Sequence, residues 1–307
     1  MSSVWKSPEG ERAVRERCLE ILKRWPVPHR QLRIPTSQGE TFVVECGPEN
    51  APPLLLLHGS VANSASWMGD ISAWAPHFRI YAIDLIGDAG LSAPSRPPFA
   101  SDAHALWLDD VLQALLLKSA SIAEVSLGGW MALDYATRRP HRVESLVLVC
   151  PAGIGRVKVS TLLKVMPLQM LGPWGKRKAA ELVLGLAQAD LPPAAREFVE
   201  FFELIHQHFR VRRVKLPIFS DEALQRLKMP LLAILGGKDM LIDSDETRQR
   251  FQTNVPHSAI RYLPEAGHFI RGQTAPILDF LAGLRAAPDL PGSATDTTSL
   301  LNNTAAR

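Results

Sequence analysis

Ser126 stands in a segment that could expose a hydroxyl group for nucleophilic attack. The segment from Ala123 to Trp130 follows an apolar run and opens a helical pattern. A serine on a sharp turn from strand to helix is lifted clear of the sheet edge, and a glycine two residues later lets the helix pack closely against the strand. Ordinary strand-to-helix turns also favour small residues, so this segment alone leaves both interpretations open.

Three further segments could complete a site around this serine. His58-Gly59-Ser60 comes directly after a short apolar run of the chain, and Asp239 and His268 each come within five residues of the end of such a run. If these runs are parallel strands, all of these residues lie at the carboxyl edge of one sheet, where open α/β sheets bind ligands. The order serine, acid, histidine is also that of catalytic triads built on such sheets. We therefore predict a triad of Ser126, Asp239 and His268.

The elements that must position these residues appear as short apolar runs alternating with helical patterns. Runs that are apolar on both faces suit strands covered by helices on each side, which indicates a mostly parallel sheet. The 307 residues, 46% hydrophobic and 21% charged, are ordinary for a globular chain. We predict an α/β fold with a doubly wound, mostly parallel sheet. The predicted strands are 31–34, 41–46, 54–57, 80–83, 121–125, 146–150, 231–235 and 260–263, and the predicted helices are 8–25, 64–75, 102–117, 127–139, 244–254 and 274–285.

One interval breaks this alternation. Residues 151–230 contain no strand-like run, and prolines interrupt several amphipathic segments within them. An insertion of about eighty residues is too long for an ordinary connection between two sheet strands, so we predict a helical lid there. Residues 1–150 and 231–287 then form the core. The Pro-, Ser- and Thr-rich residues 288–307 are predicted to be a disordered tail.

The composition excludes several classes of protein. Lysine and arginine total 34 against 31 acidic residues, and the net charge of +3 is too small for a basic surface that binds nucleic acid. No apolar run reaches the ~20 residues of a membrane span, and the charged N-terminal segment lacks the apolar core of a secretory signal. Cys18, Cys46 and Cys150 are an odd and scattered set, so we predict reduced thiols in a cytoplasmic protein.

Several short motifs carry a family resemblance. They are Leu-Lys-Arg-Trp-Pro-Val-Pro (22–28), Gly-Pro-Glu-Asn-Ala-Pro-Pro-Leu (47–54), Leu-His-Gly-Ser (57–60), Ser-Trp-Met (66–68), Tyr-Ala-Ile-Asp-Leu-Ile-Gly-Asp-Ala-Gly-Leu-Ser (81–92), Ser-Leu-Gly-Gly-Trp (126–130), Leu-Gly-Gly-Lys-Asp (235–239) and Leu-Pro-Glu-Ala-Gly-His (263–268). Through them the chain resembles the serine hydrolases of the α/β-hydrolase fold, and bacterial carboxylesterases that cleave aryl-carboxylic esters most of all. The similarity covers nearly everything except the C-terminal tail and is weakest in the predicted lid.

The resemblance implies a role for each residue of the predicted triad. It implies that Ser126 is the nucleophile, His268 the base and Asp239 the orienting acid, and that the backbone amides of Ser60 and Leu127 form the oxyanion hole. In such enzymes the histidine takes the hydroxyl proton and returns it to the leaving alkoxide, and water then hydrolyses the acyl-serine. This chemistry requires no metal and no organic cofactor.

Other titratable residues compete for these roles. Asp243 and Asp245 are alternative acids, but they stand where the next helix begins, which favours a helix cap. His206 and His208 could suggest a metal, yet alternate positions on a helix do not face one site and no Cys or acid cluster joins them. We interpret these two histidines as solvated or packed against the lid.

Apolar side chains near the predicted triad are candidates for the pocket wall. Trp67, Met68, Trp130 and Phe269 neighbour the proposed catalytic positions in sequence, although packing in the core suits each of them equally well. A further apolar stripe at helical spacing predicts a lid helix packed on the body, and its face is also a candidate ceiling for an acyl pocket. The stripe is Phe198, Phe201, Phe202, Leu204, Ile205 and Phe209.

Glu124 departs from the family pattern, which has glycine two residues before the nucleophile. Two interpretations are open: the carboxylate finds space while the elbow adjusts, or it crowds the turn and misplaces Ser126. A nearby negative charge would also favour protonated His268 and weaken it as a base. We predict reduced activity rather than none.

The sequence thus favours a carboxylic-ester hydrolase for small apolar or aryl esters. One alternative uses the same triad to cleave a carbon–carbon bond. Another is a ligand-binding protein of low activity on the hydrolase fold, and Glu124 is the residue that supports it. The expected partner is a small-molecule ester, with no nucleic acid and no membrane span, and the sequence predicts no oligomeric state.

Overall fold

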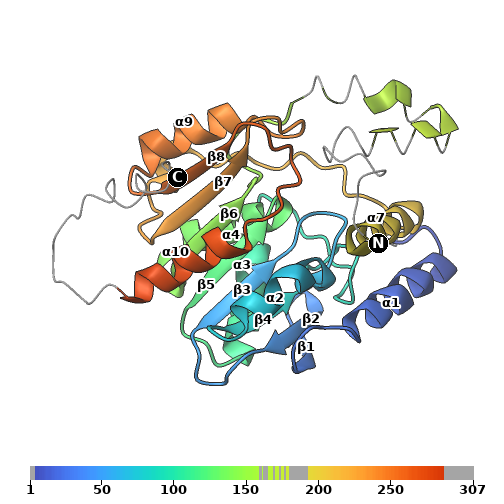
Figure 1. Cartoon of the computed structure of the whole chain (residues 1–307), viewed down its shortest axis with the longest axis horizontal. Helices are drawn as coiled ribbons and strands as arrows, with labels where there is room; N and C mark the ends of the chain where they lie inside the picture. Colours follow the sequence, from blue (N-terminus) through green and yellow to red (C-terminus); the bar gives the residue numbers. More distant parts are fainter. Residues whose placement is uncertain are drawn as a thin grey trace, which may run out of the picture.

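An eight-stranded sheet with helices on both faces forms the centre of the molecule (Figure 1). The computed structural model describes residues 4–158, 161, 165–168, 170–172, 174–175, 178–179 and 193–286. The predicted tail at 288–307 and much of the predicted lid lie outside these residues.

The sheet is mostly parallel, as predicted. Its strand order is β1-β2-β4-β3-β5-β6-β7-β8. Strand β2 runs antiparallel to β1 and β4, and each of the other neighbouring pairs is parallel. The strands are β1 His29–Thr36, β2 Gly39–Cys46, β3 Pro53–Leu57, β4 Arg79–Ile83, β5 Ala120–Val125, β6 Val143–Val149, β7 Leu231–Gly236 and β8 Ala259–Leu263.

The strand order reverses beside β3. The chain passes from β3 outward to β4, then returns to add β5 on the other side of β3. The connections at the carboxyl ends of β3 and β5 therefore diverge to opposite sides and leave a crevice between them, the place where open α/β sheets bind ligands. Ser60 follows β3 and Ser126 follows β5, so both lie at this reversal.

Two layers of helices cover the sheet. One layer consists of α3 Ala103–Ala114, α4 Leu127–Arg138, α8 Asp221–Leu224 and α9 Ser244–Asn254, whose apolar residues share one core. The other consists of α1 Pro8–Leu22, η1 Ser64–Trp67, α2 Met68–Trp74, α7 Pro193–His208 and α10 Thr274–Ala286, which share a second core. A short η2, Pro140–Arg142, lies between α4 and β6.

The strand β3 shows why the central runs are continuously apolar. Leu55 and Leu57 point into the first core, and Leu54 and Leu56 point into the second. Successive side chains of a strand alternate between the two faces, so a strand covered on both sides needs an apolar residue at every position. This arrangement explains why the runs could be recognised in the sequence.

The N-terminal segment is tied to the end of α7. Trp5 forms an isolated antiparallel bridge with Phe209. The amide of Lys6 donates to the carbonyl of His208 (2.8 Å), and its ammonium group donates to the carbonyls of His206 (2.8 Å) and Gln207 (3.0 Å). A lysine at a helix C-terminus satisfies carbonyls that have no partner within the helix and interacts favourably with the helix dipole.

The described residues of 151–230 are helical or irregular. They include α7 and α8, and Val157 makes an isolated bridge with Ile242 rather than joining the sheet. The assignment of 151–230 as a lid remains a prediction. Within the described part of the chain, the three cysteines are buried and unpaired, and no helix has the length and apolarity needed to cross a membrane.

Strand β6 ends one residue earlier than the apolar run 146–150 predicts. It ends at Val149, and Cys150 has a φ of 46°. A positive φ is uncommon for a residue other than glycine. The amide of Cys150 still donates to the carbonyl of Ile234 (3.0 Å) on β7, so Cys150 turns the chain out of the sheet while it remains attached to its edge.

Candidate active site

Ser126 occupies a strained turn between β5 and α4. Its backbone has φ 54° and ψ −103°, outside the helical and extended regions. Two bonds at the sheet edge hold it there: the Ser126 amide donates to the carbonyl of Val149 (3.0 Å), and the Ser126 carbonyl accepts from the amide of Ala152 (3.0 Å). Such strain persists only where the surroundings fix it, and it is common at functional sites. The serine hydroxyl is thereby presented at the carboxyl edge of the sheet.

Gly128 is required by the approach of α4 to β3. A Cβ at this position would lie 2.4 Å from the carbonyl oxygen of Leu57 and 2.8 Å from that of His58. No side chain fits at these distances, so the first turn of α4 packs on β3 only with glycine at position 128. The steric reason inferred from the sequence for this glycine is therefore the one that the structure shows.

The structure brings Ser126, His268 and Asp239 together in one chain of hydrogen bonds. His268 Nε2 lies 3.1 Å from Ser126 Oγ, and His268 Nδ1 lies 2.7 Å from Asp239 Oδ2. A carboxylate accepts but does not donate, so Nδ1 carries a proton and donates it to Asp239. Nε2 of the neutral ring is then free to accept the proton of the serine hydroxyl. These contacts provide the geometry that general-base activation of a serine requires.

The carboxylate of Asp239 is fixed on both oxygens. While Oδ2 accepts from His268, Oδ1 accepts from the amides of Leu241 (2.7 Å) and Ile242 (3.0 Å). Burial by itself would raise the pKa of Asp239, but the hydrogen bond and charge of His268 and the two amides together lower the pKa below its usual value. Asp239 is therefore ionised at neutral pH and can stabilise a protonated His268.

Asp243 and Asp245 lie outside this chain of hydrogen bonds. Asp243 Oδ1 accepts from the amide of Glu246 (3.0 Å) and caps the N-terminus of α9, which confirms the helix-cap interpretation. Asp245 interacts with Arg248 and with the hydroxyl of Tyr262.

The loop after β3 runs beside the serine. A Cβ built on Gly59 would lie 3.7 Å from Ser126 Cβ, so this loop and the elbow are in contact. His58 fixes the loop, since its Nε2 accepts from the amide of Leu85 (2.9 Å) and its Nδ1 faces the carbonyl of Gly59 at 2.7 Å.

Leu127 follows the serine directly, and Ser60 follows Gly59 in the loop that contacts the elbow. Neither backbone amide donates a hydrogen bond to another residue within the described part of the chain. Leu127 is the first residue of α4, where amides have no partner inside the helix. Backbone amides without a partner are the kind of donor that can stabilise a developing oxyanion, and the assignment of these two to that role remains a prediction.

Of the four residues predicted to line the pocket, some pack in the hydrophobic cores and one lies next to His268. Trp67 and Trp130 are 5% and 2% exposed and belong to the two hydrophobic cores. Trp130 donates its ring N–H to the carbonyl of Pro217 (2.9 Å), and Met68 is half-buried against the second core. Phe269, also half-buried, follows His268 directly and stacks on Phe198 of α7, with ring centroids 5.5 Å apart.

The apolar face of α7 packs on the body, as the stripe predicts. Phe201, Ile205 and Phe209 are buried in the second core. Phe198 instead contacts Phe269, one residue beyond His268. The start of α7 is thus the part that reaches the candidate site. His206 is exposed and contacts the carbonyl and ring of Phe202 one turn earlier in α7, which agrees with a solvated histidine.

Glu124 is buried beneath the elbow, on the face of β5 that α4 covers. Its side chain is fully buried, and neither carboxyl oxygen has a hydrogen-bond partner among the described residues. Both oxygens lie against Gly129, where an added Cβ would be 2.5 Å from Oε2. The space that accommodates Glu124 is therefore provided by the absence of a side chain at position 129, which the sequence reasoning did not identify.

This placement favours the first interpretation of Glu124. The carboxyl group fits under α4 while the Ser126 hydroxyl stays 3.1 Å from His268 Nε2. Burial raises the pKa of Glu124 well above its usual value, which favours the protonated, uncharged form of the group. In that protonated form Glu124 carries no negative charge that could weaken His268 as a base.

Cys150 adjoins Asp239, the acid of the predicted triad, which the sequence reasoning missed. Burial, followed by the negative charge of Asp239, raises the pKa of the Cys150 thiol well above its usual value. The available signal was its position at the carboxyl end of a strand, because the predicted site residues occupy the same edge of the sheet. The number and spacing of the cysteines bear only on disulfide pairing and give no such signal.

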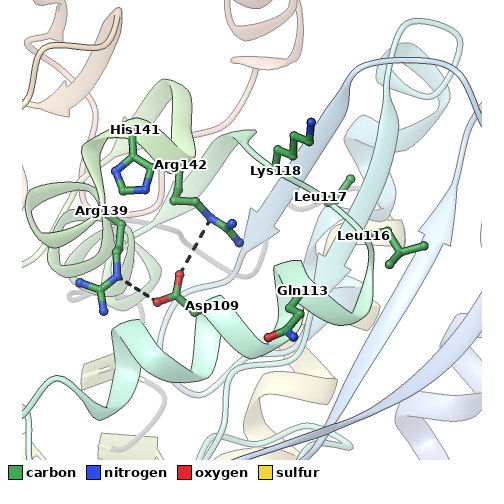
Figure 2. Close-up of a pocket in the computed structure, with 8 residues that line it drawn as sticks. All are labelled: Asp109, Gln113, Leu116, Leu117, Lys118, Arg139, His141 and Arg142. Atoms are coloured by element: carbon green, nitrogen blue, oxygen red, sulfur yellow. Dashed lines mark hydrogen bonds and ion pairs between the residues drawn. The ribbon is translucent and has the colours of Figure 1, made fainter.

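An open hollow of about 530 Å³ lies at the opposite edge of the sheet (Figure 2). It is formed by the end of α3, the residues before β5, and η2, so it lies at the amino ends of the strands. Asp109 accepts from Arg139 (3.0 Å) and faces Arg142 across 4.0 Å in its wall. Because Ser126 lies at the carboxyl ends of the strands, this hollow is separate from the candidate active site.

Comparison with known proteins shows several similarities. The family model for the alpha/beta hydrolase fold matches residues 52–271. Carboxylesterase YbfK of Bacillus subtilis (strain 168) is 28% identical over 254 residues, covering 82% of this chain and 86% of that protein. An uncharacterized carboxylesterase of the same strain, nap, is 30% identical over 258 residues, covering 82% and 84%. The crystal structure of naproxen esterase (carboxylesterase NP) from Bacillus subtilis superimposes with a TM-score of 0.77 at 27% identity, covering 91% of this chain and 99% of that one.

Proposed function

This chain belongs to the α/β-hydrolase family and hydrolyses carboxylic esters, and from that premise we propose that Ser126, His268 and Asp239 carry the reaction. The observation that supports this most strongly is the chain of hydrogen bonds from Asp239 Oδ2 through the imidazole to Ser126 Oγ. It places an oriented base on a hydroxyl that a strained turn holds at the sheet edge.

Acylation begins when Ser126 Oγ attacks the ester carbonyl carbon. His268 Nε2 takes the hydroxyl proton, and Asp239 stabilises the imidazolium that results. The carbonyl oxygen becomes an oxyanion, and the amides of Ser60 and Leu127 donate to it. Each such donor is worth about 3–4 kcal/mol of barrier in serine hydrolases. The tetrahedral intermediate then collapses, and His268 returns the proton to the departing alkoxide.

Deacylation repeats these steps with water as the nucleophile. His268 Nε2 removes a proton from water as the water attacks the acyl carbon, and the same two amides stabilise the second oxyanion. Collapse releases the carboxylic acid, and the proton passes from His268 to Ser126 Oγ. The cycle consumes one ester and one water and leaves the enzyme unchanged.

Small apolar or aryl esters are the proposed substrates. Phe198 of α7 stacks on Phe269 beside the catalytic histidine, so an aromatic surface faces the site from the proposed lid. Aromatic groups of a substrate gain from stacked or edge-to-face contact with such rings. The name of one structural relative, naproxen esterase, refers to an aryl-carboxylic ester and agrees with this choice.

Glu124 is proposed to limit the rate. The group is buried without a hydrogen-bond partner among the described residues, so at alkaline pH its ionisation would place an uncompensated charge beneath the nucleophile. We expect Glu124→Gly to raise ester turnover, most of all above neutral pH. An unchanged rate across the pH range would show that Glu124 has no such effect.

The enzyme is also proposed to act in the cytoplasm. Its three cysteines are unpaired and buried, as expected for a protein of a reducing compartment.

A fluorophosphonate probe tests the proposed nucleophile. We expect the wild type to be labelled and to release p-nitrophenol from short-chain p-nitrophenyl esters, and Ser126→Ala to do neither. Ser66→Ala is the matched control, because the Ser66 hydroxyl only donates to the carbonyl of Asn63 (2.8 Å) in η1. Labelling of Ser126→Ala at the wild-type rate would assign the nucleophile elsewhere. Cleavage of a vinylogous diketone faster than of the esters would favour carbon–carbon hydrolysis.

A further inference from the structure

Three side chains that can bind a metal converge at His268, which is one of them. The sulfur of Cys150, a carboxylate oxygen of Asp239 and a ring nitrogen of His268 all lie within 4.8 Å of one another. They come from the ends of β6, β7 and β8, three neighbouring strands of the sheet. This is the one such group of three or more found among the residues that the structure describes.

The donor set matches the preference of one class of cation. Thiolate sulfur, imidazole nitrogen and carboxylate oxygen are the ligands of Zn²⁺, whereas Mg²⁺ and Ca²⁺ prefer oxygen alone. Ligand atoms around a tetrahedral Zn²⁺ lie about 3.5 Å apart, because its bonds are about 2.0–2.3 Å long. Closing the group around an ion therefore requires movements of about 1 Å, which side-chain rotation can supply.

We propose that a thiophilic divalent cation such as Zn²⁺ binds between Cys150 Sγ, Asp239 Oδ2 and His268 Nδ1, and that this binding turns the hydrolase off. His268 is the ligand that an entering ion meets first, since 10% of its side chain is exposed while the side chain of Asp239 is fully covered. The fourth tetrahedral position is left to water. The site is inhibitory and has no part in ester hydrolysis.

Inhibition follows from the proton balance at His268. In the resting triad Nδ1 holds the ring proton and Nε2 faces Ser126 Oγ. A cation on Nδ1 displaces that proton, and the neutral ring then carries its proton on Nε2, where it can no longer accept one from the serine. The thiol proton of Cys150 passes to solvent as the metal–sulfur bond forms. The loss of activity rests on the function proposed for Ser126 and His268, whereas the binding itself does not.

Zinc titration of cysteine variants tests the proposal. We would measure ester turnover of chelator-stripped enzyme against ZnCl₂, each variant relative to its own metal-free rate. The variants are Cys150→Ala and Cys150→Ser, which keeps the size but removes the soft ligand. Cys46→Ala is the matched control, a buried cysteine outside the group of three donors. Addition of CdCl₂ reports binding directly through the ultraviolet charge-transfer absorption of a cadmium–thiolate bond.

We expect Zn²⁺ to inhibit the wild type and the Cys46→Ala variant, and EDTA to restore both. Loss of an outer-shell partner weakens metal binding by about 10–100-fold, so loss of the sulfur ligand should raise the half-inhibiting zinc concentration at least about tenfold. The cadmium band should vanish in both Cys150 variants. Equal zinc sensitivity in the Cys150 variants, or a cadmium band that persists in them, would overturn the proposal. If no ester is hydrolysed at all, the cadmium band still decides the metal site, and the failure belongs to the proposed function.

Discussion

The titration of Glu124 should be measurable as a pH dependence of folding stability. Glu124→Gln keeps the shape of the side chain and removes its ability to ionise. In the wild type, burial raises the pKa of this carboxyl group well above its value of 4.5 in an unfolded chain. The folded state therefore holds a proton that the unfolded state releases as the pH rises, and stability falls with pH. The stabilising contribution is complete below pH 4.5 and is lost as the pH rises toward the folded-state pKa.

The size of the effect follows from proton linkage. One group protonated in the folded state and ionised in the unfolded state changes the free energy of unfolding by about 1.4 kcal/mol per pH unit. Between pH 5 and pH 7 the Glu124 contribution should therefore fall by up to about 2.7 kcal/mol. The glutamine variant loses this slope and keeps those of all other groups. The difference between the two proteins isolates Glu124.

Urea unfolding followed by tryptophan fluorescence would measure this difference at pH 5, 6, 7 and 8. The seven tryptophans include Trp130 of α4, which is buried in the core between this helix layer and the sheet. Glu49→Gln is the matched control, since Glu49 is exposed. We expect Glu124→Gln to gain stability over the wild type steadily as the pH rises, and Glu49→Gln to follow the wild type. Parallel curves for Glu124→Gln and the wild type would show that the buried group is not protonated in the folded state.

Three more variants test other contacts. Asp239→Asn should lower kcat by about 10⁴-fold, because the imidazole loses the charge that orients it. Asp243→Ala should keep kcat and lower the stability by about 1 kcal/mol, because a helix cap is lost. Ester kinetics and urea melts would separate the two effects, and equal losses of kcat would contradict the assignment of Asp239. Gly129→Ala should destabilise the protein by about 1–3 kcal/mol, because the added methyl group would contact Glu124. In a double-mutant cycle, Glu124→Gly should restore most of the stability lost in Gly129→Ala, and additive effects would argue against the contact. Phe198→Ala should raise KM for aryl esters up to about tenfold, since an aromatic pair is worth about 0.5–1.5 kcal/mol. Acetate esters serve as the control. An equal change in KM for both kinds of ester would show that Phe198 is not part of an aryl-binding surface.

The sheet and the convergence of the site could be predicted because both depend on local sequence. The runs of β3 and its neighbours are apolar at every position, since helices cover both faces. Position 128 must be glycine because the backbone of α4 approaches that of β3 closely. The sequence already indicates this requirement, since the glycine stands two residues after Ser126. Residues placed after successive parallel strands must share an edge of the sheet, so Asp239 and His268 could be located before any distance was known.

Contacts between segments far apart in the chain could not be predicted in the same way. Glu124 is out of place in the sequence pattern, but the space that receives it depends on the rotation of α4, which brings Gly129 over the carboxyl group. Cys150 leaves β6 at a positive φ, a conformation that no pattern in its neighbours signals. Trp130 stands four residues after the nucleophile, yet helical rotation turns its ring into the core.

With the substrate-binding role proposed for Phe198 and Phe269, the anchoring of α7 links substrate selection to residues at the far end of the helix. One end of this helix touches Phe269 through Phe198, while the other is attached to Trp5 and Lys6 near the start of the chain. Because α7 is one continuous helix, a tilt at its attached C-terminal end also displaces Phe198 near its N-terminal end. Altered packing around Trp5 would therefore open or narrow the aromatic surface beside His268 without changing a catalytic group. Variants selected for bulkier esters are accordingly expected to carry substitutions at this remote attachment as well as in the wall of the site.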